Sequence, residues 1–302
     1  MKKFFLFLLL LCAAFTGNAA EGFTFSEQDI KSLGLRFEPV SIRIPGLKKS
    51  YRFLWMSDLH VMEEDVSEIE KKWQPAMIFR RDRRFNNPLS KLSPAQVWKK
   101  LPAVLNDSGA DALFFGGDIC DTGSAANLKL LAEGFKQLKS PFIFLREDHD
   151  FSPWHLVKKD KSEQKKISNA IDGHPTVPVI EYDDLMIIGI DQSVFNITPE
   201  AVKKFKTLLA KGKPVLLLIH VPLCSNNTPE LSSRHVWGGK KKMSKTVREF
   251  FDLVLAPESQ IKAVFSGHLH GSGWQGRLTP ELPQYVFKAA FEGFIGTITV
   301  TP

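Results

Sequence analysis

Aspartate and histidine recur in five short motifs of this 302-residue chain, and each motif directly follows a mostly apolar run. In chain order the motifs are DLH at 58–60, GDICD at 117–121, EDHD at 147–150, His220 after an isoleucine, and GHLH at 267–270. Carboxylate and imidazole without thiolate suit Mn, Fe, Zn, Co or Ni, but neither an all-oxygen calcium site nor a cysteine-type structural zinc site. The motifs therefore indicate a transition-metal site.

The apolar runs before these motifs have the pattern of buried strands, because most are apolar on both faces. They alternate with stretches of helical periodicity, which is the layout of an α/β fold. The carboxyl ends of strands in open α/β sheets line one crevice, so the motifs should converge. The expected strands cover residues 51–57, 112–117, 141–145, 185–190, 214–219 and 261–266, with later β-type runs at 284–290 and 296–300. The expected helices follow positions 94, 127, 199 and 244.

The ordered motifs resemble those of the calcineurin-like metallophosphoesterases, whose pattern runs D-x-H, G-D-x-x-D, G-N-H-D/E, a single H and then G-H-x-H. The resemblance extends from Asp58 to beyond His270. It implies a four-layer αββα sandwich, in which two mixed β-sheets pack face to face and are flanked by helices. Only the third motif departs from the pattern, because EDHD stands where the family has G-N-H-D or G-N-H-E.

The resemblance also implies a set of ligands for two transition-metal ions. The ligands of one ion correspond to Asp58, His60 and His270, those of the other to His220 and His268, with Asp118 as the bridging carboxylate and Asp148 in the place of a metal-binding asparagine. Two ions roughly 3.5–4 Å apart can hold a bridging hydroxide as nucleophile and stabilise the attacking and leaving oxygens of an in-line displacement at phosphorus. The expected reaction is phosphoester hydrolysis, with phosphodiesters slightly preferred.

His149 and Asp150 are the expected catalytic residues that do not bind metal. His149 is placed to stabilise charge at the reacting phosphoryl group or to protonate the leaving oxygen, and Asp150 is expected to orient its ring. Asp121 is expected either to support the site from behind the ligands or to cap the following helix. Glu147 stands where the family has glycine and has no expected role.

The long segment between His220 and the last helix contains Arg234 and His235. A loop in this position, beside the metals, could contact substrate, and these two residues are the candidates for that contact. The alternative is that both are ordinary surface residues.

The first twenty residues combine Lys2 and Lys3 with the apolar run FFLFLLLLCAAF and small residues up to Ala20, the layout of a cleaved export signal. An uncleaved anchor is one alternative, although the run is short for a membrane span. Lipidation at Cys12 is another, disfavoured because the preceding residue is a bulky leucine. We expect residues 1–20 to be a signal peptide, residues 21–302 to form one metallophosphoesterase domain, and the mature protein to be periplasmic or secreted.

The charge and the cysteine content say little about binding partners. The formal charge of +7 falls to +5 without Lys2 and Lys3, a modest excess that favours an anionic substrate without specifically indicating nucleic acid. Cys120 and Cys224 are too few for a disulfide framework, and they either pair or remain free buried thiols. No membrane span is expected in the mature chain, and the oligomeric state stays open.

These features together predict an exported two-metal hydrolase of phosphoric esters. One alternative is a phosphomonoesterase of the same family. The other is a binding scaffold that keeps the fold after its catalytic site has weakened, which the altered EDHD motif leaves open. Every histidine of the pattern is retained, and this favours an enzyme.

Overall fold

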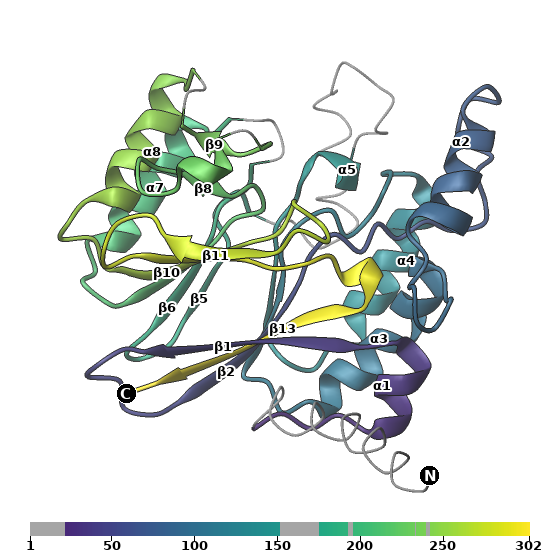
Figure 1. The fold of residues 1–302 in the computed structure, drawn as a ribbon, viewed down its shortest axis with the longest axis horizontal. Helices are drawn as coiled ribbons and strands as arrows, with labels where there is room; N and C mark the ends of the chain where they lie inside the picture. The colour runs from purple at the N-terminus through teal and green to yellow at the C-terminus, as the bar shows by residue number, and fades with distance from the viewer. Residues whose placement is uncertain (1–21, 152–174, 193–195, 233, 240–241) are drawn as a thin grey trace, which may run out of the picture.

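The computed structural model describes residues 22–151, 175–192, 196–232, 234–239 and 242–302. In these residues two large β-sheets pack face to face, and helices cover the outer face of each sheet (Figure 1). The predicted four-layer αββα sandwich is therefore confirmed. The predicted signal segment, residues 1–20, lies outside the described residues.

The first sheet has five strands within the described residues, in the order β1-β13-β2-β3-β4. Their bounds are β1 Arg36–Arg43, β13 Phe294–Thr301, β2 Tyr51–Met56, β3 Ala112–Phe115 and β4 Phe142–Phe144. Only the β13–β2 pair is antiparallel. Because β2, β3 and β4 run parallel, their carboxyl ends lie at one edge of the sheet.

The second sheet has six strands in the described part of the chain, in the order β11-β12-β10-β7-β6-β5. Their bounds are β11 Trp274–Arg277, β12 Pro283–Val286, β10 Ile261–Ser266, β7 Val215–Leu218, β6 Met186–Gly189 and β5 Val179–Glu181. The four inner strands β12, β10, β7 and β6 are parallel to one another. A separate short pair joins β8 (Leu223–Cys224) to β9 (Trp237–Gly238).

Alternate residues of the strands divide the core into layers, because successive side chains of a strand point to opposite faces. In β2, Phe53 and Trp55 belong to the core between the sheets, together with Leu216 and Phe265 of the second sheet. Leu54 of the same strand faces the helices outside. Strands buried on both faces must be apolar throughout, which explains the continuous apolar runs in the sequence.

Among the described residues, five helices form the outer layers. Helices α1 (Glu27–Leu33), α3 (Pro94–Asp107) and α4 (Ala125–Lys136) pack on the first sheet, and α7 (Pro199–Leu209) and α8 (Lys245–Leu255) on the second. Ser93, Ser124, Thr198 and Ser244 cap the N-termini of α3, α4, α7 and α8 through their side-chain oxygens. Each such cap contributes about 1 kcal/mol. All four predicted helices and all eight predicted strands are present.

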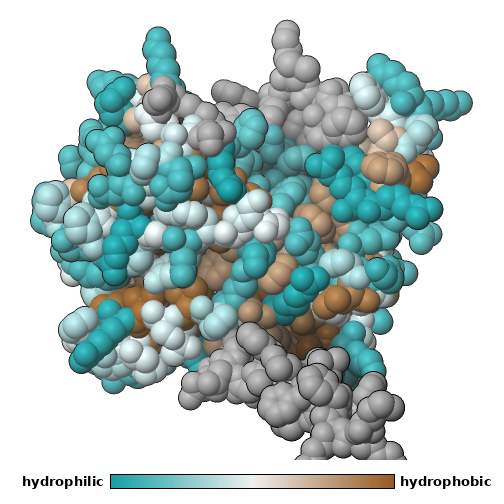
Figure 2. Space-filling view, in the orientation of Figure 1, coloured by the Kyte–Doolittle hydropathy of each residue, from teal (hydrophilic) through white to brown (hydrophobic). Residues whose placement is uncertain are grey.

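The shorter elements are α2 (Gln74–Phe79), the π-helical turn η1 (Arg80–Arg84), α5 (Asp148–Phe151), η2 (Pro229–Leu231) and η3 (Ala290–Glu292). The face shown in Figure 2 is mostly hydrophilic, with apolar areas in several places, one of them at the upper right, where Figure 1 places α2. Ile78 and Phe79 of α2 are exposed there. No helix among the described residues has the length and hydrophobicity needed to cross a membrane.

Candidate metal centre

Six of the seven predicted ligands converge in two adjacent groups between the carboxyl ends of the two sheets. In each group the potential ligand atoms lie within 4.8 Å of one another. The first group consists of Asp58, His60 and His270, and the second of Asp118, His220 and His268. Each group therefore combines residues that follow strands of the first sheet with residues that follow strands of the second.

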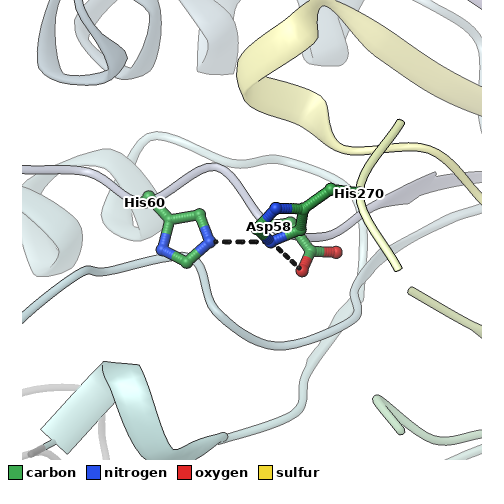
Figure 3. Close-up of side chains that lie close together, drawn as sticks. All are labelled: Asp58, His60 and His270. Atoms are coloured by element: carbon green, nitrogen blue, oxygen red, sulfur yellow. Dashed lines mark hydrogen bonds and ion pairs between the residues drawn. The ribbon is translucent and has the colours of Figure 1, made fainter. Parts of the chain in front are cut away.

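The first group presents three donor atoms to one small space, as the close-up in Figure 3 shows. Nε2 of His270 lies 3.3 Å from Nε2 of His60 and 3.3 Å from Oδ1 of Asp58. Oδ2 of Asp58 accepts the backbone N–H of His268 at 3.0 Å. Oδ1 of Asp58 is buried and has no hydrogen-bond partner among the described residues.

The second group is built in the same way and touches the first. Nε2 of His220 lies 3.2 Å from Oδ2 of Asp118 and 3.3 Å from Nδ1 of His268. It also lies 3.9 Å from Oδ1 of Asp58, which links the two groups. Oδ1 of Asp118 is, within the described chain, another buried oxygen without a hydrogen bond.

In two of the histidines Nδ1 already contacts another residue, so Nε2 is the atom available to a metal ion. Nδ1 of His220 donates to the carbonyl of Gly116 at 2.7 Å, so Nε2 is the nitrogen that faces the cluster. Nδ1 of His60 lies 3.0 Å from Oδ1 of Asp121, so Nε2 again faces the cluster. Metal-binding histidines usually donate their other N–H in this way to a carbonyl or a carboxylate.

These observations test whether metal ions fit the cluster. Buried carboxylate oxygens without hydrogen bonds are costly, and a cation between them would satisfy both. Three carboxylate or imidazole donors per group suit a transition-metal ion. The residues present therefore fit a metal centre.

The backbone at the cluster adopts the left-handed conformation that side chains other than glycine rarely take. The φ angle is +55° at Asp58, +52° at His60, +51° at Asp118, +71° at His268 and +50° at His270. Among the described non-glycine residues only Lys91 shares it. Such residues are strained unless the surrounding structure holds them, and they concentrate at functional sites.

Two neighbouring glycines allow the strand ends to approach closely. A β-carbon at Gly267 would lie 2.5 Å from Oδ2 of Asp58 and 2.1 Å from Oγ of Ser57. A β-carbon at Gly117 would lie 2.8 Å from Nδ1 of His220. Any larger side chain at either position would displace a predicted ligand.

Asp121 holds His60, one of the predicted ligands, in position. Its buried carboxylate is 3.0 Å from Nδ1 of His60 and receives two hydrogen bonds from Arg80, at 2.7 Å from Nε and 2.6 Å from Nη2. Burial alone would raise the pKa of Asp121, but the hydrogen bonds from Arg80, together with the nearby His149 and His60 rings, hold it well below its usual range. Ser124 is the N-cap of α4, so the alternative that Asp121 caps this helix is wrong.

The predicted pairing of His149 with Asp150 is wrong. Asp150 is buried, and its carboxylate accepts the backbone N–H groups of Asp118 at 3.1 Å, Cys120 at 2.9 Å and Glu147 at 2.8 Å. It therefore fixes the loops after β3 and β4. Nδ1 of His149 lies instead 3.1 Å from Oδ1 of Asp121, a charge contact outside hydrogen-bonding alignment.

His149 is flanked by carboxylates. Burial lowers its pKa, but Asp118 and then Asp121 outweigh burial and raise the pKa of His149 to about 9. Asp148, in the place of the family's asparagine, lies within 4.8 Å of Asp118 and His149 through its ligand atoms. The structure thus places Asp148 beside the second group without bringing it within that distance of His220 and His268.

A cavity of about 610 Å³ opens in front of the second group. Asp118, Glu147, Asp148, His149, His268 and His270 line one part of it. Arg234 and His235 line it as well, with Val221, Val236, Trp237 and Leu269 forming an apolar wall. The two candidates from the long segment are therefore close enough to the cluster to meet a substrate.

Several residues that hold the site were missed in the sequence. Phe85 stacks on the ring of His60, with ring centroids 4.2 Å apart and planes 7° from parallel. Oε1 of Gln192 accepts the backbone N–H groups of His220 at 2.9 Å and Val221 at 2.7 Å. Gln192 follows a predicted strand by two residues, so a search for all polar residues at strand ends would have found it. Both Cys120 and Cys224 are free and buried.

Comparison with known proteins agrees with this geometry. The sequence profile of the calcineurin-like phosphoesterases matches residues 51–272, which is more than half of the chain and includes every predicted ligand. The chain belongs to this family. The predicted class of enzyme, a metal-dependent phosphoesterase, is thereby confirmed.

Individual relatives are distant. The chain is 26% identical over 167 residues to the probable glycerophosphodiester phosphodiesterase GpdQ of Arcobacter nitrofigilis, an alignment that covers 53% of this chain and 56% of the relative. Among solved structures it is similar to a dimetal phosphatase from Danio rerio, at 10% identity over 80% of this chain and 88% of that one, with a TM-score of 0.47. It is also similar to the purple acid phosphatase PPD1 from yellow lupin, at 12% identity over 83% and 45% of the two chains, with a TM-score of 0.47.

Proposed function

We propose that this member of the family is an exported hydrolase of phosphoric esters that binds two transition-metal ions and prefers phosphodiesters. The observation that carries the proposal is the pair of adjacent ligand groups, each with one buried carboxylate oxygen that lacks a hydrogen bond within the described chain. Asp58, His60 and His270 would hold one ion and His220 and His268 the other, with Asp118 between them. When bound, two such ions supply an activated water and stabilise negative charge on the phosphoryl oxygens.

The chain's own residues then have separate tasks. His149 lines the cavity beside Asp118 and Asp148, and in the metal-free protein the Asp118 carboxylate raises the pKa of His149 to about 9. A protonated imidazole in this place can donate to a phosphoryl oxygen or deliver a proton to the leaving alcohol. Asp121 lies 3.1 Å from Nδ1 of His149, so Nε2 would be the nitrogen that acts on the substrate.

Charge supports the preference for diesters. Two divalent ions carry +4 and the carboxylates of Asp58, Asp118 and Asp148 carry −3, which leaves a formal charge of +1. A less positive site attracts a dianionic monoester less strongly. The attraction for a singly charged diester falls by a smaller amount. The distant relative named as a probable glycerophosphodiester phosphodiesterase is consistent with a diester substrate.

The residues that line the cavity can contact the parts of a substrate other than its phosphoryl group. Arg234 and His235 can contact an anionic or polar group, and the apolar wall with Trp237 can contact a less polar one. The alternative of a monoesterase rests on the same Arg234, because a guanidinium could compensate the second charge of a monoester. The binding-scaffold alternative is disfavoured because all four predicted histidine ligands lie in the cluster.

The test is metal-dependent hydrolysis by the purified chain. Turnover of bis-p-nitrophenyl phosphate and p-nitrophenyl phosphate is measured before and after chelation and after Mn²⁺ is restored. We expect activity to disappear on chelation, to return with the metal and to be higher on the diester. Asp183→Asn, a change at an exposed position distant in sequence from every motif, is the matched control and should behave as wild type. Undiminished hydrolysis by metal-free protein would contradict the proposal.

The exported location and the domain extent belong to the same proposal. The basic, apolar and small residues of 1–20 favour removal of this segment on export. Strands β1 and β13 lie outside the matched residues 51–272 and still belong to the first sheet, which favours one domain over 21–302. N-terminal sequencing of the protein recovered outside the cytoplasm should begin near Glu21. Full-length protein recovered only from the cytosol would contradict export.

A further inference from the structure

Two buried glutamines bind the segment of the chain that follows β7. Gln192 comes after β6 and Gln284 lies in β12, and both residues are 0% exposed. The segment that they contact, residues 220–224, begins with the proposed ligand His220 and ends with β8. A buried amide needs hydrogen-bond partners, because burying its oxygen or its nitrogen without one costs free energy. The partners of these two amides therefore show what each glutamine holds.

Gln192 holds the start of the segment. Its Oε1 accepts the backbone N–H groups of His220 at 2.9 Å and Val221 at 2.7 Å. Its Nε2 donates to the Val221 carbonyl at 3.4 Å, which is a longer and weaker bond. The ring of His220 is fixed separately, through the bond from Nδ1 to the Gly116 carbonyl at 2.7 Å. Gln192 therefore fixes the backbone of this ligand and Gly116 fixes its ring.

Gln284 holds the end of the segment. Its Oε1 accepts the backbone N–H of Leu223 at 2.9 Å, and its Nε2 donates to the carbonyl of the same residue at 3.0 Å. One side-chain amide thus satisfies both backbone groups of Leu223, as a neighbouring strand would do. Gln284 therefore takes the place of a strand partner on one side of β8.

The other side of β8 pairs with β9, which forms part of the cavity wall. The carbonyl of Pro222 accepts the backbone N–H of Trp237 at 2.9 Å. Trp237 lines the cavity, and so do Arg234 and His235 shortly before it in the chain. The position of β8, and with it Gln284, therefore bears on the wall that contains the candidate substrate contacts.

We propose that Gln192 and Gln284 are positioning residues with separate tasks, Gln192 for the metal ligand His220 and Gln284 for the cavity wall that determines substrate binding. This inference rests on the proposed function. The tasks are separable because the two amides bond different residues of the segment. Between the bonded residues lies Pro222, which has no N–H that needs a partner and has a fixed φ angle.

The chemistry of the two amides predicts different responses to substitution. Methionine has a similar size, but it leaves the backbone groups without partners at either position. Glutamate can accept hydrogen bonds but, when ionised, cannot donate one. Gln192 makes its two short bonds as an acceptor, so Gln192→Glu should retain them. Gln284→Glu should lose the bond to the Leu223 carbonyl and bring two oxygens together.

The experiment compares wild type with the methionine and glutamate variants at both positions. Asn87→Leu is the matched control, because Asn87 is a 1% exposed amide that donates to the carbonyls of Leu33 and Gly34 at the end of α1. Each chain is titrated calorimetrically with Mn²⁺, and kcat and KM on bis-p-nitrophenyl phosphate are measured at saturating Mn²⁺. Thermal unfolding and NMR-detected amide hydrogen exchange are recorded on the metal-free chains.

Gln192→Met should weaken metal binding and leave substrate binding unchanged. We expect the Kd of one of two Mn²⁺ ions to rise roughly 10- to 100-fold, as when a group that orients a ligand is lost. The Kd of the other ion and the KM at saturating Mn²⁺ should stay at the wild-type values. The amides of His220 and Val221 should exchange faster than in wild type. Gln192→Glu should recover most of the lost metal affinity.

Gln284→Met should show the opposite division. Both metal affinities should equal those of wild type, whereas KM should rise roughly tenfold, as when one charged hydrogen bond to the substrate is lost. Hydrogen exchange should become faster at Leu223 and Trp237. Gln284→Glu should not recover KM, and Asn87→Leu should lower Tm alone.

The outcomes distinguish this inference from the proposed function. The proposed function fails if wild type binds fewer than two ions or does not hydrolyse the diester, and the hydrogen exchange still reports whether each glutamine holds its end of the segment. The inference is overturned if all variants lose only Tm, as Asn87→Leu does, or if metal affinity and KM change together at both positions. Should a methionine variant not fold, the glutamate variant at that position provides the comparison.

Discussion

Nδ1 of His149, which lines the cavity, lies 3.1 Å from Oδ1 of the buried Asp121. The same oxygen lies 3.0 Å from Nδ1 of His60, a predicted metal ligand. One carboxylate therefore sets the position of both a ligand and the residue expected to act on the substrate. Arg80 in turn fixes that carboxylate through two hydrogen bonds.

Asp121→Asn should lower turnover and metal affinity together. The amide cannot orient both rings, and it removes the negative charge that accepts two hydrogen bonds from Arg80. We expect kcat on the diester to fall roughly 10- to 100-fold. Asp150→Asn is the comparison, because Asp150 bonds only backbone groups in the described chain and should mainly lower Tm. Equal losses of kcat per folded molecule in both variants would contradict the assignment of the supporting role to Asp121.

His149→Ala should retain both metal ions and lose most turnover, by about 10²- to 10⁴-fold in kcat. The ring is expected to act on charge in the substrate, although it lies within 4.8 Å of Asp118 and Asp148 through its ligand atoms. Metal content and kcat are measured on the same sample. A parallel loss of metal and rate would show that His149 is itself a ligand.

His149 should titrate with a raised pKa in the metal-free protein. Its pKa rises from the ordinary 6.5 to about 9 because Asp118 and Asp121 together outweigh the effect of burial. A raised folded-state pKa means that protonation stabilises the fold fully below about pH 6.5, and that this stabilisation is lost as the pH rises through about 9. NMR titration of ring signals, with His149→Gln for assignment, measures this directly. A value at or below 6.5 would contradict the charge contact.

Asp148→Asn should shift the enzyme toward monoesters. Restoring the amide raises the formal charge of the site by one, which strengthens its attraction for a dianion and weakens its hold on the second ion. The ratio of kcat/KM on p-nitrophenyl phosphate to that on bis-p-nitrophenyl phosphate should rise, while the Kd for the second ion should also rise. If neither quantity changes, Asp148 is not a ligand.

Gly267→Ala should disturb the first ligand group. The new β-carbon would lie 2.5 Å from Oδ2 of Asp58, which must move and lose the N–H of His268. We expect a loss of about 1–3 kcal/mol in stability together with weaker metal binding. Gly271→Ala is the control, because its β-carbon would meet only the carboxylate end of Glu292 at 3.1 Å. Wild-type metal affinity in Gly267→Ala would show that the turn tolerates the side chain.

The proposed ligands and most of the fold can be predicted from the sequence for one physical reason. Asp58, Asp118 and His220 each follow a strand that is buried on both faces, so an apolar run marks both the strand and the position of its end. Parallel neighbours then place those ends together. Strand β1 was missed because it alternates between buried and exposed residues and contains Pro39, both compatible with an edge strand.

The residues that position the ligands depend on contacts that no local pattern encodes. Arg80 and Phe85 lie in a segment without strand or helix signals, and their contacts with Asp121 and His60 require that segment to fold back over the site. The expectation that Asp150 orients the ring of His149 is wrong because residues adjacent in sequence need not have side chains that meet. In the helical turn α5 successive side chains differ by roughly 100°, so neighbouring His149 and Asp150 face different groups.

The division of the ligands between the two sheets has a consequence for how the protein matures. Asp58, His60 and Asp118 follow strands of the first sheet, whereas His220, His268 and His270 follow strands of the second. Neither half of the chain carries a complete donor set, and the last ligands are synthesised more than 200 residues after the first. If these residues bind metal as proposed, high-affinity uptake must wait until both sheets have docked, and binding of the ions would then mark the completion of folding.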